Sequence, residues 1–179
     1  MPLAEIWQLL EQVPDPEIPV VSIRELGILR DVRYAPNGDI EVVITPTYSG
    51  CPAMGQIADD VHTALQQAGA HAKIVTQLAP AWTTDWMTDA AKAKLRAYGI
   101  APPQCSAEPA PQGGQNTTHL IAVRAMIHWA NAPFSIKPVP CPRCNSVNTT
   151  ETSHFASTAC KALYKCLDCL EPFDYFKPY

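Results

Sequence analysis

Residues 28–47 read ILRDVRYAPNGDIEVVITPT, and this stretch decides the fold of the first half of the chain. Its two arms, about 28–34 and 39–45, contain the β-branched and aromatic residues that favour extended backbone. Asn37-Gly38 between the arms has the chemistry of a tight turn, because both residues tolerate a positive φ. The stretch therefore predicts a β-hairpin.

Helical and strand patterns surround the hairpin. Apolar residues of 3–12 fall on one helical face, and a longer amphipathic helix is expected over about 52–68, with Pro52 at its start. A third strand is predicted over 71–78 and a last helix over about 85–98. This αββαβα order predicts a small α+β domain over residues 1–103, in which a sheet packs against helices.

The composition excludes several classes of protein. The net charge of −4 and the lack of a lysine/arginine run argue against a nucleic-acid partner. No stretch of about eighteen apolar residues occurs, so no membrane-spanning helix is expected. The first residues do not have the pattern of a secretory signal, and the seven cysteines are therefore expected as thiols or metal ligands in the cytoplasm.

A second module is expected over 133–179, after a linker over 104–132. Residues 104–116 of this linker are rich in Pro, Gly and Gln, and residues 118–130 have the pattern of a short amphipathic helix. It contains two C-x2-C pairs, formed by Cys141 with Cys144 and by Cys166 with Cys169. Two such turns place four thiolates around one metal ion, which predicts a zinc-ribbon-like module. A single iron ion, as in rubredoxin, would have the same ligands. Cys160, between the pairs, is interpreted as a small buried residue.

Cys51 stands apart from that group, in TYSGCPAM (47–54). It lies at the predicted start of the helix over 52–68, where free N–H groups and the helix dipole favour a thiolate with a lowered pKa. A reactive or metal-binding thiol is one interpretation, and a small residue at a tight strand-to-helix turn is the other. No base accompanies Cys51 in a recognisable pattern, so no catalytic residue is predicted and the protein is not expected to be an enzyme.

Oxygen-bearing side chains form a candidate pocket with this thiol. The candidates are Asp15, Glu17, Thr45, Thr47 and Tyr48. The two carboxylates lie in the proline-stiffened DPEIP loop, where they could either add oxygen ligands or cap the loop. The hydroxyl groups could hydrogen-bond the sulfur or the backbone.

Several stretches together resemble the PaaD (also called PaaJ) family, which are accessory proteins of phenylacetyl-CoA epoxidase. They are DPEIPVVSIRELGILRDV (15–32), ITPTYSGCPAM (44–54), LAPAWTTDWMT (78–88), YGIAPP (98–103), CPRC (141–144) and STACKALYKCLDCLEPFDYFK (157–177). The first hundred residues also resemble a wider family of iron–sulfur assembly factors that includes SufT.

The resemblance implies a factor that helps to assemble iron–sulfur or other metal centres for the epoxidase of phenylacetate degradation. The oxygenation chemistry would belong to partner subunits, and the expected partner is the reductase that carries flavin and an iron–sulfur cluster. The family implies that Cys51 is the functional cysteine and contacts a transient cluster. One thiolate cannot hold a cluster alone, so a second protomer of a homodimer, or a client, would supply further ligands. A redox subunit and a structural subunit of the epoxidase complex are the alternatives.

Overall fold

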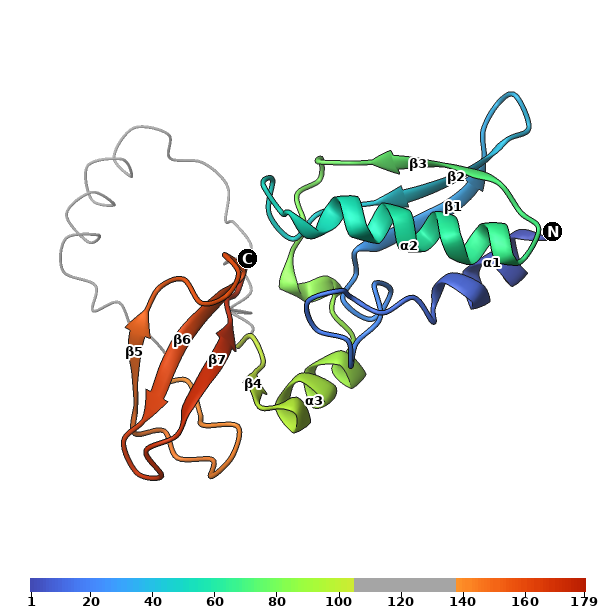
Figure 1. The fold of residues 1–179 in the computed structure, drawn as a ribbon. Helices are drawn as coiled ribbons and strands as arrows, with labels where there is room; N and C mark the ends of the chain where they lie inside the picture. Colours follow the sequence, from blue (N-terminus) through green and yellow to red (C-terminus); the bar gives the residue numbers. More distant parts are fainter. Residues whose placement is uncertain (105–137) are drawn as a thin grey trace, which may run out of the picture.

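The computed structural model describes residues 1–104 and 138–179, which form two sheets with helices packed beside the first (Figure 1). The first sheet has the order β1-β2-β3, with bounds β1 Leu29–Tyr34, β2 Ile40–Ile44 and β3 Ala72–Thr76. β1 pairs antiparallel with β2, and β2 pairs parallel with β3. The expected α+β class and the αββαβα order are both confirmed.

The predicted hairpin is present between β1 and β2, where Tyr34 pairs with Ile40. Asn37 Oδ1 accepts a hydrogen bond from Asp39 N at 3.1 Å, and Gly38 adopts a φ of +86°. A positive φ costs glycine nothing, which explains why Asn37-Gly38 forms the turn.

Two helices cover the first sheet. α1 (Leu3–Leu10) lies against β1, and α2 (Ala53–Gln67) connects β2 to β3 and packs against both α1 and β3. Their buried side chains meet those of the sheet in one core, and they include Ile6, Leu10, Ile57, Val61 and Leu65. Because α2 begins soon after β2, the loop that carries Cys51 is fixed at one end of the sheet.

The single helix predicted over 85–98 is wrong in one respect, because the structure divides it. A short 3-10 helix, η1 (Thr84–Trp86), precedes α3 (Asp89–Tyr98). Thr88 Oγ1 accepts a hydrogen bond from Ala91 N at 3.0 Å and so caps α3. This cap satisfies a free N–H of the first turn, which starts a new helix at residue 89 instead of continuing the old one.

The second sheet has the order β4-β7-β6-β5, and its bounds are β4 Ile100–Ala101, β5 Thr149–Ser153, β6 Lys161–Cys166 and β7 Pro172–Phe176. The short strand β4 follows α3 directly and pairs parallel with β7. Gln104 Nε2 donates to Pro138 O at 2.9 Å, so the two ends of the described ranges lie beside each other. Of the expected linker over 104–132, all but Gln104 lies outside the described residues, and so does its short helix over 118–130.

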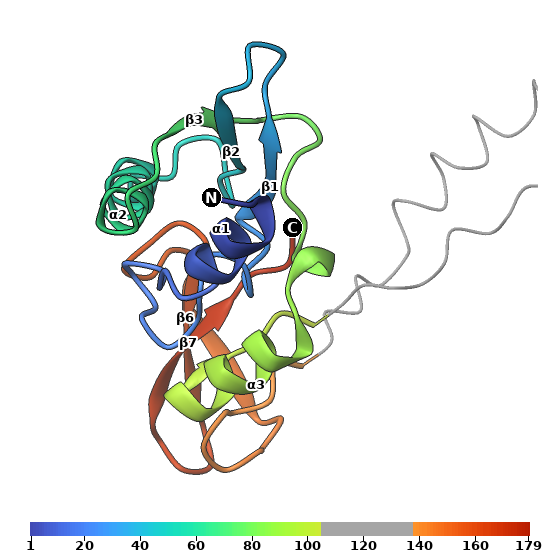
Figure 2. The ribbon, with the colours of Figure 1, turned by 90° about the vertical axis from the view of Figure 1, so that its right-hand side faces the viewer.

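The second sheet packs against the loops below the first sheet (Figure 2). Phe176 and Cys160 belong to the core of the first sheet although they lie on the second module. The Trp82 ring lies 6.0 Å from the Phe176 ring, and Thr84 N donates to Tyr179 O at 3.2 Å. The two halves are therefore joined by buried apolar contact and by backbone hydrogen bonds.

One glycine is required by close packing within the first half of the chain. Gly27 has a φ of +75°, and a Cβ there would lie 2.7 Å from Trp86 Cβ. Any other residue at this position would press its Cβ against the Cβ and the backbone carbonyl of Trp86, and its backbone would be strained at this φ.

Among the helices of residues 1–104 and 138–179, none has the length and apolar character needed to cross a membrane.

Candidate metal centres

The four paired cysteines come together at one end of the second sheet. Their Sγ atoms all lie within 4.8 Å of one another: Cys141, Cys144, Cys166 and Cys169. The Sγ atoms of Cys141 and Cys169 are 3.8 Å apart, and those of Cys144 and Cys166 are 3.5 Å apart. Four sulfurs about 2.3 Å from one zinc ion would be separated by about 3.8 Å, so the group suits a tetrahedral metal ion.

Each C-x2-C turn is completed by a residue of positive φ. Asn145 and Leu170 follow the second cysteine of their pairs, and both have a φ of 64°. Asp168 joins the two turns, because its carboxylate accepts hydrogen bonds from Ser146 Oγ and, at 2.7 Å, from Asn148 Nδ2. The turns are therefore held together by hydrogen bonds in addition to any shared metal ion.

Backbone N–H groups also prepare one sulfur for metal binding. Cys169 N donates to Cys166 Sγ at 3.5 Å. This hydrogen bond, aided by the Asp168 N–H, lowers the pKa of the Cys166 thiol to about 7. A thiol with that pKa is partly ionised at neutral pH, and the thiolate is the form that binds a metal.

Cys51 lies in the turn between β2 and α2. α2 begins at Ala53 with Pro52 as its N-cap, so Cys51 precedes the cap, and its N–H donates to Tyr48 O at 3.1 Å. The side chain is half-buried. The Ala53 N–H and the Thr47 hydroxyl lie close enough to the Cys51 sulfur to lower its pKa in part. The loop thus holds the thiol in a fixed position at the surface of the first domain.

The predicted lowering of the Cys51 pKa is wrong. Burial raises the pKa of the thiol, and the Ala53 N–H opposes that effect only in part. The carboxylates of Glu17 and Asp15 raise the pKa further because they repel a thiolate. The sequence argument considers only the helix terminus, whereas the DPEIP loop brings two acidic groups to the same place.

The predicted pocket residues have different surroundings. Asp15 is buried, and its Oδ1 accepts hydrogen bonds from Glu17 N at 3.0 Å and Ile18 N at 2.8 Å. Asp15 therefore caps the loop, in agreement with one of its two interpretations. Thr47 is buried beside Cys51. Thr45 is 1% exposed, and its Oγ1 has no hydrogen-bond partner within residues 1–104 and 138–179.

Glu17 and Tyr48 contact the second module. The Glu17 carboxylate lies near the Thr158 hydroxyl, and its pKa is raised by burial and by Asp15. The Tyr48 hydroxyl lies near the backbone of Ala159. These two contacts place the segment before β6 directly against the loops that carry the candidate pocket.

Cys160, for which the sequence predicts no functional role, lies at this contact. The interpretation as a small buried residue agrees with its 4% exposure, and its Sγ lies 3.0 Å from Thr158 Oγ1. Burial raises the pKa of Cys160, and the nearby charges of Glu17 and Cys51 raise it further. The sequence does mark Cys160 as unusual, because it lies outside the C-x2-C spacing. It does not show that Cys160 lies near Cys51, because the two residues are far apart in sequence.

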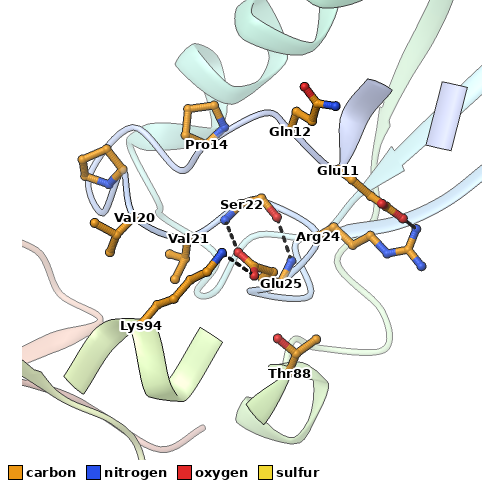
Figure 3. Close-up of a pocket in the computed structure, with 11 residues that line it drawn as sticks. Glu11, Gln12, Pro14, Val20, Val21, Ser22, Arg24, Glu25, Thr88 and Lys94 are labelled. Atoms are coloured by element: carbon orange, nitrogen blue, oxygen red, sulfur yellow. Dashed lines mark hydrogen bonds and ion pairs between the residues drawn. The ribbon is translucent and has the colours of Figure 1, made fainter. Parts of the chain in front are cut away.

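A separate cavity of about 440 Å³ lies between the loop over residues 11–25 and α3 (Figure 3). None of the predicted site residues lines it. Its charged side chains are paired with one another, Arg24 with Glu11 and Lys94 with Glu25 at 2.6 Å. The cavity therefore offers no unpaired charge from these two pairs to a ligand.

Comparison with known proteins covers both halves of the chain. Residues 131–177 match the family described as the PaaD zinc beta ribbon domain, and residues 3–76 match that described as the iron-sulfur cluster assembly protein. A protein of Escherichia coli (strain K12), described as a putative subunit of 1,2-phenylacetyl-CoA epoxidase, is 46% identical over 174 residues, which cover 97% of this chain and 91% of that protein.

Shorter matches involve the first half alone. An Fe-S protein maturation auxiliary factor from Porphyromonas gingivalis (strain ATCC BAA-308 / W83) is 32% identical over 93 residues, or 51% of this chain and 88% of that protein. The crystal structure of a domain of unknown function, DUF59, from Bacillus anthracis has a TM-score of 0.47 at 31% identity, covering 52% of this chain and 90% of that one.

The match to the E. coli protein extends over nearly the whole of both chains, and the matched ribbon includes all four paired cysteines. The chain therefore belongs to the PaaD family.

Proposed function

We propose that this protein is a non-enzymatic accessory factor that assists the assembly of an iron–sulfur or other metal centre in subunits of phenylacetyl-CoA epoxidase. The whole-length similarity to a putative epoxidase subunit supports the pathway. The similarity of its first half to an Fe-S protein maturation auxiliary factor supports a role in the assembly of metal centres. The reductase that carries an iron–sulfur cluster is the proposed recipient.

One observation carries the proposal. Cys51 is held half-buried by its turn, and the carboxylates of Glu17 and Asp15 lie close enough to act on it electrostatically. A thiol surrounded by acidic groups is complementary to a metal cation. Because a single thiol fills few of the coordination positions of a metal centre, the bound centre remains open to ligands from a client.

The four-cysteine centre has a structural role in this proposal. Zinc is the proposed ion, because closed sites of four thiolates are typical of structural zinc. Such an ion holds the turns before β5 and β7 together in a module that has a small core of its own. The fixed module then presents its β6–β7 side to the first domain.

The test replaces Cys51 by Ala in cells that lack the wild-type copy. We expect at least about a tenfold loss of epoxidase activity and of reductase-bound iron, because a metal ligand is removed. The purified variant should keep its fold and its ribbon zinc. Cys105, the seventh cysteine of the chain, belongs to neither proposed centre, and Cys105→Ala is the matched control for removal of a thiol. Full activity and full iron loading with Cys51→Ala would overturn the proposal.

An electron-carrying subunit is the second candidate, because four thiolates also hold a single iron ion. Purification without air separates the two, since a ferric four-thiolate site is red and a zinc site is colourless. A structural subunit would instead co-purify with the epoxidase at fixed stoichiometry, whereas an assembly factor activates it at substoichiometric amounts.

A further inference from the structure

The contact between the two halves of the chain brings a second thiol to the candidate pocket. Cys160 lies just before β6, and it is packed in the core of the first sheet together with Cys51, which borders that core. Its sequence neighbours Thr158 and Ala159 lie near enough to Glu17 and Tyr48, respectively, to lower the pKa values of those two side chains in part. Tyr48 is also the residue whose carbonyl holds the Cys51 turn.

Cys160 is separate from the four-cysteine centre. It precedes β6, whereas Cys166 ends that strand, so the two are about 20 Å apart at about 3.3 Å per residue. The described sulfur atoms that gather into one group are those of the paired cysteines, and Cys160 is not among them. Its position therefore has no explanation in the ribbon metal site.

Charge at this contact is acidic. Glu17 lies near enough to act on Cys51, Cys160 and Tyr48, and Asp15 acts on Cys51. The nearby cation is Lys161, which is 5% exposed and forms an ion pair with Asp174 at 3.2 Å. Asp15, Glu17 and Cys160 all lie near Lys161, which already has a partner. A bound cation would complement this surplus of acidic groups.

We propose that Cys160 supplies a second thiolate to the metal centre of Cys51, so that the first domain and the ribbon share one thiophilic site. This inference rests on the proposed function. It adds a second ligand, Cys160, which comes from the ribbon and not from the first domain. Each thiol gives up its proton as its sulfur binds the metal. Cys51, the more exposed of the two, forms the entrance, and Cys160 forms the buried side.

The shared site explains why one chain carries both modules. The ribbon places Cys160 only while β6 and β7 are packed on the first domain, and that packing depends on buried contacts such as Trp82 with Phe176. Two thiolates leave other positions of an iron–sulfur cluster open, since such clusters take four protein thiolates. A client with two free cysteines would complete the set and withdraw the cluster.

The test measures metal retention by the full-length chain. The four-cysteine centre is first filled with zinc, and the protein is then incubated without air with ferrous iron and sulfide and passed through gel filtration. Retained iron, sulfide and zinc are counted for the wild type, Cys51→Ala, Cys160→Ala and the double variant, with Cys105→Ala as the matched control.

We expect each single variant to retain at least about tenfold less iron than the wild type, with zinc unchanged, because either loss removes one of two thiolates. The double variant should be no worse than the single ones. Cys160→Ala with wild-type iron would overturn the inference. If Cys160→Ala also loses zinc, its fold is damaged, and Cys160→Ser decides: zinc kept with iron lost supports the shared site, and both kept overturns it.

The cell assay separates this inference from the proposed function. Iron lost from Cys51→Ala but kept by Cys160→Ala would remove the shared site and leave the proposed function standing. Iron lost from both variants together with full epoxidase maturation in cells would keep the shared site and remove the proposed function.

Discussion

The two cysteine regions of this protein are built in opposite ways. The four-cysteine centre gathers its sulfurs from two short turns of one module, with all four Sγ atoms within 4.8 Å. The region of Cys51 and Cys160 draws on the DPEIP loop, the turn before α2 and the segment before β6. The first is local and closed, whereas the second exists only through packing of distant segments.

This difference suggests different tolerances to change. A closed group of four thiolates holds its ion tightly and resists exchange, which suits structure. In the proposed function, a half-buried thiol among acidic groups, fixed by contacts between two halves of the chain, would bind a metal and also release it. Three changes test this comparison, beginning with the one of largest expected effect.

Replacing Cys166 by Ala should remove the metal from the four-cysteine centre and unfold the ribbon. Structural zinc contributes about 10–16 kcal/mol of apparent binding free energy in zinc-finger peptides, so its loss outweighs the small core of this module. Zinc content and circular dichroism measure the effect. Cys51→Ala is the control and should keep its zinc. A Cys166→Ala protein with wild-type zinc and thermal stability would contradict the comparison.

Replacing Phe176 by Ala should weaken the packing between the two halves. Phe176 is 1% exposed and contacts Trp82, so its truncation should lower the free energy of unfolding by about 3–5 kcal/mol. Urea unfolding gives the value. Phe155→Ala, at a site that is 62% exposed, is the matched control and should change stability by less than about 0.5 kcal/mol. Equal effects of the two substitutions would show that the buried Phe176 contact between the halves adds no stability.

Replacing Asp15 by Asn should have the smallest effect, and the effect should depend on pH. Burial raises the pKa of Asp15 above 3.8, so its contribution is fully present below that pH and is lost as the pH rises through the folded-state value. A tenfold difference in proton affinity between the folded and unfolded states corresponds to about 1.4 kcal/mol of unfolding free energy. Asn keeps the acceptor for the loop N–H groups and does not ionise.

The variant should therefore gain stability relative to the wild type as the pH rises from 3.8 toward neutrality. Unfolding free energies measured at several pH values give this difference. Asp39→Asn, in the exposed hairpin turn, serves as the control. A constant difference between Asp15→Asn and the wild type over this range would argue against a buried carboxyl group beside Cys51.

Local patterns predict what depends on local physics. The hairpin follows from alternating strand residues and Asn37-Gly38, and the four-cysteine group follows from two C-x2-C turns. The break before α3 does not emerge from periodicity, although Thr88 followed by an acidic residue has the chemistry of a helix cap. The apolar residues before and after Thr88 fit the spacing of one helix, so periodicity alone predicts a single helix over 85–98.

The candidate pocket depends on information that spacing does not contain. Glu17 and Asp15 reverse the expected pKa direction of Cys51 because the loop folds back beside the turn. Cys160 reaches the same place because β4 and the β6–β7 hairpin dock the ribbon against the first domain. A search for cysteines outside the C-x2-C spacing finds Cys160, but it does not show that Cys160 lies near Cys51.

The hydrogen bond between Gln104 and Pro138 has a consequence for how this chain can vary. The chain leaves the described fold after residue 104 and re-enters it at residue 138, at one point on the sheet edge where β4 is already paired with β7. The free-energy cost of closing such a connection changes only slowly with its length. We therefore expect that a change in the number of residues between Gln104 and Pro138 leaves the register of both sheets intact.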